Sequence, residues 1–123
     1  MSAIPYCDDV LDRSVPVVQL VDVAKSLGVA TSRVHQMVRD RQLLAFKRDR
    51  VPVLPEAFLD EEGNVLKGLP GLIAVLHDGG YEDDEILRWL FTDDDSLPGG
   101  CPVAAMHTQS AREVMRRAQA LAF

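Results

Sequence analysis

The order of apolar and polar positions predicts two short amphipathic helices within residues 20–40. Over residues 20–27 apolar side chains recur at i, i+3, i+4 and i+7, which places them on one face of a helix. Gly28 is expected to end this helix, because glycine takes a left-handed backbone at no steric cost. A second helix follows, with Thr31 or Ser32 as a possible N-cap. Its expected buried face consists of Val34, Met37 and Val38.

Three residues indicate that these two helices cross closely. Ala24 is small, Gly28 follows four residues later, and Val34 is β-branched and lies six residues beyond that. Val29, just after the glycine, is expected to return to the core. Such spacing is typical of a helix-turn-helix, whose second helix protrudes and can enter a DNA major groove.

Two β-prone runs after these helices predict a hairpin. The runs cover residues 42–46 and 51–55 and flank a charged tip, Lys47 to Arg50. Pro52 restricts the second run to an edge strand or a strand end, since proline cannot donate a hydrogen bond. The tip has neither glycine nor asparagine, which disfavours the two-residue turn types, so a longer type I loop is expected.

Beyond a polar break at residues 60–64 the sequence predicts only helices. The last of them is expected to open at Pro102 and to run to the end of the chain. The expected fold class is mainly α: a winged helix-turn-helix with a small β-hairpin wing, followed by a C-terminal helical subdomain. The expected parts are a flexible N-terminal arm (1–15), with a loosely packed strand as the alternative, the winged domain (16–62) and a helical domain packed on it (63–123).

Charge is distributed unevenly along a chain whose net charge is −6. Residues 25–50 contain seven bases and two acids, whereas the rest contains six bases and 17 acids. Because attraction to DNA depends on positive potential within roughly 8–10 Å, a local basic region on an acidic body is compatible with DNA binding. The same imbalance argues against indiscriminate coating of nucleic acid.

Other features of the sequence favour a soluble cytoplasmic protein associated with the nucleoid. No apolar run approaches the roughly 18 residues of a membrane span, and the N-terminus lacks the pattern of a secretory signal. The two cysteines, Cys7 and Cys101, lie far apart and are expected to be reduced.

The candidate DNA contacts lie on the second helix and on the hairpin tip. Arginine suits guanine, glutamine suits adenine, and hydroxyl side chains suit phosphates or base edges. A merely solvated helix face and a solubilising turn are the alternatives. The candidates are Thr31, Ser32, Arg33, His35, Gln36, Arg39, Arg41, Lys47, Arg48 and Arg50.

Motifs for catalysis, metals or cofactors are not recognisable. The acidic runs at 82–85 and 93–95 lack the ligand spacing of a calcium loop and are better explained by helix capping and solvation. No histidine pairs with a cysteine or carboxylate at a zinc spacing, and no phosphate loop or nucleophile elbow is present. We therefore expect no enzyme, no cofactor and no metal.

Longer segments carry a family resemblance. Residues 20–59, with VAKSLGV, SRVHQMVRDRQLLA and RVPVLPEAFL, resemble the MerR/excisionase type of winged helix-turn-helix. Together with KGLPGLIAVLHDGGYEDDEILRWLF and AREVMRRAQALAF, they resemble a small actinobacterial regulator family known from mycobacteria, which has its own C-terminal helical domain. The resemblance covers nearly all of residues 16–123. It implies a cytosolic, non-enzymatic DNA-binding protein whose contacts lie at 31–39 and 47–50.

The sequence thus predicts a sequence-responsive or architectural protein that binds double-stranded DNA and acts as a transcriptional or nucleoid-type regulator. Helix 31–40 is expected in the major groove, and the wing on the backbone or in the minor groove. The alternative is a protein-interaction module, antitoxin-like or an adaptor. The segment WLFTDDDSLPGGCPVAAM is similar to the toxin-binding domain of Xre-type antitoxins, and the C-terminal helices could hold a second copy or another protein.

Overall fold

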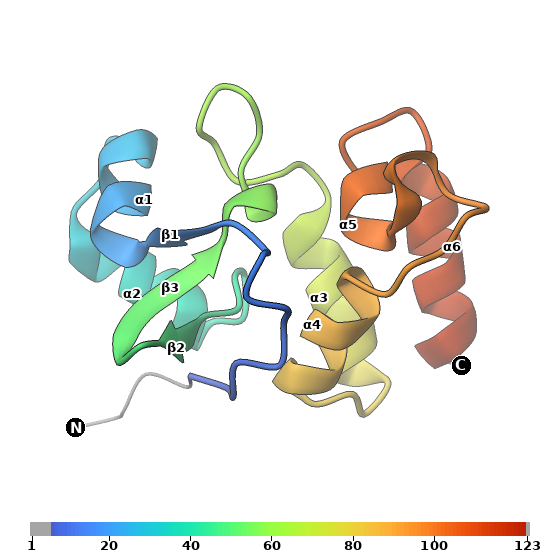
Figure 1. Ribbon diagram of the computed structural model, residues 1–123, viewed down its shortest axis with the longest axis horizontal. Helices are drawn as coiled ribbons and strands as arrows, with labels where there is room; N and C mark the ends of the chain where they lie inside the picture. The colour runs from blue at the N-terminus through green and yellow to red at the C-terminus, as the bar shows by residue number, and fades with distance from the viewer. Residues whose placement is uncertain (1–5, 123) are drawn as a thin grey trace.

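A computed structural model describes residues 6–122 of the chain. Helices form most of its regular structure, and a small sheet lies in the N-terminal half (Figure 1). No helix in residues 6–122 is long and apolar enough to cross a membrane. In chain order the elements are β1 (Val17–Gln19), α1 (Leu20–Leu27), α2 (Thr31–Arg39), β2 (Phe46–Arg48), β3 (Val51–Pro55), the 3-10 helix η1 (Glu56–Phe58), α3 (Leu69–Asp78), α4 (Asp83–Leu90), the 3-10 helix η2 (Pro98–Gly100), α5 (Pro102–Ala105) and α6 (Ala111–Ala122).

The sheet has three antiparallel strands in the order β1-β3-β2. Val18 lies opposite Leu54, and Phe46 lies opposite Val53. The sequence analysis expected the β2–β3 hairpin but not β1, which has only three residues and leads directly into α1. Because β3 has a partner on each side, it is the central strand. Of the two expectations for Pro52, the edge strand is therefore wrong, whereas the strand end agrees with its place as the second residue of β3, before the residues that pair with β1. The sheet tolerates this proline because it lies near the N-terminal end of β3.

The turn between β2 and β3 also differs from expectation. Arg48 pairs with Val51, so only Asp49 and Arg50 connect the strands. Their φ angles are 53° and 70°, positive at both central positions as in a type I′ turn. The expected longer loop is therefore wrong. The tight turn matches the twist of the strands, and this compensates for a left-handed conformation that is unfavourable for a residue such as arginine.

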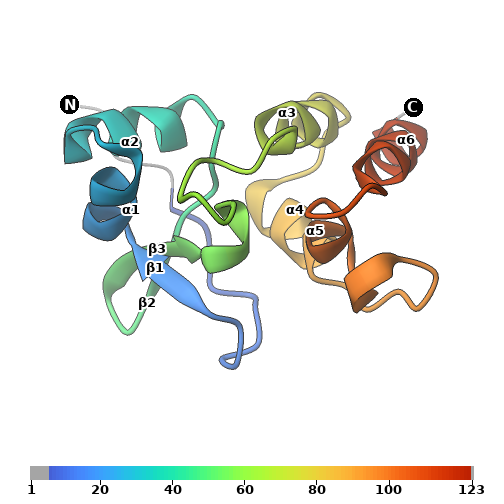
Figure 2. The ribbon, with the colours of Figure 1, turned by 90° about the horizontal axis from the view of Figure 1, so that it is seen from above.

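The two halves of the chain lie at opposite ends of the molecule and share one core. Figures 1 and 2 place α1, α2 and the sheet at one end, and α5 and α6 at the other. The helix α3 packs between α4 and α6, so its apolar face is buried on both sides. Leu72, Ile73 and Leu87 are fully buried there, while Phe46 and Phe58 fill the core of the N-terminal half.

The last helical segment is interrupted. α5 ends at Ala105 and α6 begins at Ala111, so the expected single helix from Pro102 to the end of the chain is wrong. The Thr108 hydroxyl donates to the Ala105 carbonyl oxygen at 2.6 Å and accepts from the Ser110 N–H at 3.0 Å. Such local side-chain bonds compete with helical ones, and here they end one helix and begin the next.

Residues 6–15 form an extended arm that packs between the sheet and α4 (Figures 1 and 2). The Cys7 N–H donates to the Ala45 carbonyl oxygen at 3.2 Å, and the Leu11 side chain is buried. From residue 6 onward the segment expected as a flexible arm or a loosely packed strand thus packs against the rest of the chain, whereas residues 1–5 lie outside the described residues. The segment packs because Leu11 and the acidic side chains beside it contact the rest of the chain.

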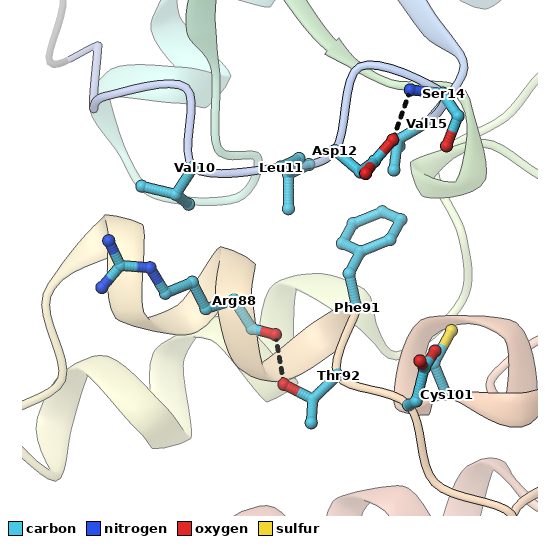
Figure 3. A pocket seen from close by; sticks show the side chains of 10 residues that line it. Val10, Leu11, Asp12, Ser14, Val15, Arg88, Phe91, Thr92 and Cys101 are labelled. Carbon is cyan, nitrogen blue, oxygen red and sulfur yellow. Dashed lines mark hydrogen bonds between the residues drawn. The ribbon is translucent and has the colours of Figure 1, made fainter.

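A cavity of about 620 Å³ lies where the arm meets the C-terminal helices (Figure 3). Figure 3 shows Leu11 pointing from the arm toward α4 and the Phe91 ring pointing up toward the arm. Arg88 contributes a cation to the lining, whereas Asp12 and Asp93 contribute carboxylates. This mixed lining shows that the arm covers the C-terminal helices only in part.

Candidate nucleic-acid interface

The turn between α1 and α2 requires the glycine. Gly28 has φ 71° and ψ 33°, a left-handed conformation. Its N–H donates to the Lys25 carbonyl oxygen at 3.2 Å, and the Val29 N–H donates to the Ala24 carbonyl oxygen at 3.0 Å. These two bonds satisfy carbonyl groups at the end of α1, as in a Schellman motif. Val29 itself is 39% exposed and does not return to the core as expected.

Helix α2 begins without a side-chain cap. Its N-cap is Ala30, so neither Thr31 nor Ser32 occupies the capping position that the sequence suggested. Both residues lie in the first turn instead. Val34 and Val38 are buried, and Met37 is half-buried, which fixes the face that α2 turns toward α1 and the core.

The exposed face of α2 is polar. Ser32, Arg33 and Gln36 are exposed and lie one turn apart or less. The Gln36 amide nitrogen donates to an Asp40 carboxylate oxygen at 3.0 Å. No ion pair with Arg33 occurs within residues 6–122. This face therefore offers one unpaired cation and an amide held by a single hydrogen bond.

Two further candidates lie toward the wing. Thr31 and His35, four residues apart on α2, line a cavity of about 190 Å³ together with Val51 and Pro52 of β3. Val21 of α1 forms another part of the lining, and Val21 and Val51 are 43% and 37% exposed. The sequence analysis did not include these valines. They are apolar residues at the start of two elements, so their position beside α2 depends on the fold and not on a local pattern.

Arg39 lies where the arm passes the end of α2. Its Nε atom is buried without a hydrogen-bond partner among the described residues. Burial raises the pKa of the Tyr6 hydroxyl, and the nearby charge of Arg39 partly opposes this shift. The Lys47 ammonium lies 5.3 Å from the centre of the Tyr6 ring, in a cation–π arrangement. Tyr6 thus connects two of the candidate cations.

Arg41 lies just beyond α2 and faces the C-terminal half. Its φ of 56° is left-handed, and its N–H donates to the Val38 carbonyl oxygen at 3.1 Å. The Gln42 N–H donates to the Met37 carbonyl oxygen at 2.9 Å, which completes a Schellman motif with arginine at the usual glycine position. The Arg41 Nε atom lies 3.4 Å from an Asp83 carboxylate oxygen at the start of α4. This arginine connects the two halves of the chain.

Arg48 is enclosed by the arm. Its Nε and Nη2 atoms donate to the two Asp9 carboxylate oxygens at 2.9 and 3.2 Å. Its guanidinium also donates to the Val15 carbonyl oxygen at 2.9 Å and to the Asp12 carbonyl oxygen at 3.2 Å. The hydrogen bond from Arg48 lowers the pKa of Asp9. Only 9% of the Arg48 side chain is exposed, so its donors are directed into the protein.

Arg50 completes the wing tip. It is exposed and forms no ion pair with any residue in the range 6–122. Its neighbour Asp49 is paired with Arg13 of the arm at 2.7 Å, on the surface. The structure thus brings α2 and the wing tip to the same end of the molecule (Figure 2), but it encloses the Arg48 guanidinium and pairs the partly exposed Arg41 with Asp83 of the C-terminal half.

Comparisons with known proteins agree over both halves of the chain. A family model described as "DNA-binding protein Rv2175c, wHTH domain" matches residues 3–59, and one described as "Rv2175c C-terminal domain of unknown function" matches residues 66–122. The DNA-binding protein Rv2175c of Mycobacterium tuberculosis (strain ATCC 25618 / H37Rv) is 46% identical over 134 residues, which cover 100% of this chain and 92% of the relative. The NMR structure of Rv2175c aligns with a TM-score of 0.87 and 47% identity, over 99% of this chain and 91% of that one.

Proposed function

The chain belongs to the family of the DNA-binding protein Rv2175c, and we propose that it too binds double-stranded DNA, as a transcriptional regulator. The family is named for DNA binding and not for a catalytic activity. In this proposal α2 enters the major groove, and the tip of the β2–β3 hairpin lies on the adjacent backbone or in the minor groove.

The observation that carries this proposal is the position of the unpaired cations. Arg33 on α2 and Arg50 at the wing tip are exposed, form no ion pair within the described range, and lie at the end of the molecule opposite α5 and α6. Lys25 on α1 and Lys47 on β2 are exposed as well. A purely protein-binding module has no need of several unpaired cations beside a protruding helix in a chain of net charge −6.

The exposed side chains of α2 have the chemistry for base contacts. Arg33 can donate two hydrogen bonds to a guanine edge, and Gln36 can bond an adenine edge once its amide leaves Asp40. Thr31 and His35, at the cavity beside the wing, are placed for the sugar-phosphate backbone, and Val21 and Val51 offer apolar contacts to it or to a thymine methyl group.

In this proposal Arg48 has a structural role inside the protein, and Arg41 has a structural role in the contact between the two halves of the chain. Arg48 already donates four hydrogen bonds, and Arg41 is paired with Asp83. The proposed phosphate contacts come from Arg33, Arg39, Lys47 and Arg50. Four such contacts predict a slope of about −3 to −4 when the logarithm of the binding constant is plotted against the logarithm of the salt concentration.

A salt titration of fluorescence anisotropy with a labelled duplex tests the proposal. Arg33→Ala should weaken binding and make the slope less steep by about one if Arg33 contacts a phosphate. If Arg33 reads a base instead, the variant should lose about 1–3 kcal/mol of binding free energy on the preferred sequence only. The matched control is Arg116→Ala, which removes an exposed arginine from α6, at the far end of the molecule.

Two outcomes would contradict the proposal. One is an absence of binding to any duplex at low salt, which would favour the protein-interaction alternative. The other is an equal loss of affinity in Arg33→Ala and Arg116→Ala, which would mean that general positive charge and not the α2 surface determines binding. Selection of bound sequences from a random duplex pool, followed by a reporter assay on the selected site, then tests whether binding regulates transcription.

A further inference from the structure

A second concave surface lies on the C-terminal helices, between the start of α3 and the start of α6. It is a groove of about 440 Å³. Two short segments beside these helix starts and the first turn and a half of α6 supply its walls. The lining residues are Lys67, Gly68, Met106, Thr108, Gln109, Ala111, Arg112 and Met115.

The floor of the groove is apolar, and two glycines of α3 and its start leave room for its methionine side chains. A Cβ atom added to Gly68 would lie 3.6 Å from the Met106 Cε atom, and one added to Gly71 would lie 3.7 Å from the Met115 Cε atom. The two methionine methyl groups therefore occupy the space beside α3 that larger side chains would fill. Methionine is flexible and polarisable, so such a surface adapts to an apolar ligand.

The charged side chains of the groove are both cationic. Lys67 and Arg112 are exposed, and neither forms an ion pair with a residue in the described part of the chain. The lining includes no aspartate or glutamate, although residues 63–123 contain nine acids and five bases. A groove with only positive charge on an acidic body is complementary to an anion.

We propose that this groove binds a small amphipathic carboxylate, with its alkyl chain on the methionine floor and its carboxylate between Lys67 and Arg112. The volume lies within the roughly 300–1,000 Å³ typical of small-molecule sites, whose walls are mostly apolar with a few polar groups that fix orientation. The Arg112 guanidinium can hold a carboxylate through two parallel hydrogen bonds, and Lys67 adds a second positive charge.

The proposal is independent of DNA binding. The groove is lined by residues 67–115 of the C-terminal half, and it shares no residue with the proposed DNA surface. Loss of DNA binding would therefore leave the ligand site intact, and loss of the ligand site would leave DNA binding intact. The site also gives a specific role to the C-terminal helices.

Octanoate is the probe, and NMR of isotope-labelled methionine methyl groups is the measurement. We expect saturable shifts of the Met106 and Met115 methyl signals at octanoate concentrations below micelle formation, with the Met37 signal on α2 unchanged as the internal control. Octylammonium has the same chain with the opposite charge, and butanoate has the same charge with a shorter chain. Both should bind about tenfold more weakly or worse.

Two pairs of variants test the floor and the cationic side chains separately. Gly71→Leu should fill the space beside Met115 and weaken octanoate binding about tenfold, whereas Gly71→Ala adds only a Cβ at ordinary contact distance and serves as the control for folding. Arg112→Gln should weaken binding by a similar factor. Arg116→Gln removes another arginine from the same helix, outside the groove, and should change nothing.

Several results would overturn the proposal. One is the absence of any Met106 or Met115 shift with octanoate, and another is equal binding of octylammonium. A third is binding that persists unchanged in both Gly71→Leu and Arg112→Gln, which would place the ligand elsewhere. Binding of a short acidic peptide with leucine side chains but not of octanoate would identify the groove as a protein-docking surface and would also reject the assignment to a small carboxylate.

Discussion

The strongest test of the fold is the replacement of Arg48 by alanine. The sequence pattern places Arg48 on the wing as a DNA contact, whereas the structure encloses its guanidinium between the wing and the arm. Four hydrogen bonds leave this group, two to the Asp9 carboxylate and two to backbone carbonyl oxygens of the arm. Arg48→Ala removes all four, so the arm should lose its main attachment to the wing.

The expected loss of stability in Arg48→Ala follows from how deeply the Arg48–Asp9 pair is buried. Removing one partner of a fully buried pair costs about 3–5 kcal/mol, because the other charge is left without compensation. Here 19% of the Asp9 side chain is exposed, so its carboxylate regains water once Arg48 is absent. A hydrogen bond to a charged group contributes about 1.5–3 kcal/mol, and neighbouring bonds to one group are not additive. We expect Arg48→Ala to lower the free energy of unfolding by about 2–3 kcal/mol.

The pH dependence of the free energy of unfolding provides a second test of the Arg48–Asp9 pair. Hydrogen bonding to Arg48 lowers the pKa of Asp9 below its ordinary value of 3.8 in the folded protein. The stabilisation is therefore fully present above that ordinary value and is lost as the pH falls through the lower, folded-state pKa. Urea unfolding of wild type and Arg48→Ala should differ by the full amount at about pH 7 and by less at about pH 3.

Arg50→Ala is the matched comparison, because Arg50 lies in the same hairpin but is exposed and unpaired in the described part of the structure. It should change the free energy of unfolding by less than about 0.5 kcal/mol and make the DNA salt slope less steep by about one. Arg48→Ala should instead lower the free energy of unfolding and leave the DNA salt slope unchanged. If Arg48→Ala unfolds like wild type and reduces the slope by one, the buried assignment of Arg48 is wrong.

Three further predictions concern single residues elsewhere. Gly28→Ala should lower the free energy of unfolding by about 1–2 kcal/mol in thermal or urea unfolding, because φ is 71° at the α1–α2 turn; an unchanged midpoint would argue against the left-handed turn. Glu85→Ala removes the carboxylate that accepts a hydrogen bond from the Glu82 N–H at 2.9 Å at the start of α4, so the free energy of unfolding should fall by about 1 kcal/mol, and an unchanged value would mean that the cap contributes nothing. Burial raises the pKa of the Cys7 thiol to about 12, so alkylation of Cys7 in native protein at about pH 8 should be much slower than in urea, and equal rates would contradict its burial.

The features that could be predicted from sequence are those encoded by neighbouring residues. The glycine between α1 and α2, the apolar stripes of both helices and the two runs of the hairpin all lie within a few residues of their partners. On this basis the expected fold class, a mainly helical winged helix-turn-helix with a small sheet, is confirmed. The expected family, with its own C-terminal helical domain, is confirmed as well.

The features that could not be predicted depend on partners far apart in the chain. β1 has three residues and becomes a strand because Val18 meets Leu54 of β3. The tight turn at Asp49 and Arg50 has no glycine signal, since strand pairing imposes its positive φ angles. The end of α5 depends on the Thr108 hydroxyl, which an apolar periodicity does not include.

The difference between local patterns and long-range partners also limits what a count of charges along the sequence can predict. Seven bases lie in residues 25–50, and the structure pairs two of them with acids from outside that range: Arg41 with Asp83, and Arg48 with Asp9. Asp49, an acid within the range, is paired with a base from outside it. The region therefore stays positive, and its cations without an ion pair among the described residues lie on α1, α2 and the hairpin. Counting charges along the sequence locates a basic surface, whereas only the long-range pairs decide which arginines hold the protein together and which remain available to DNA.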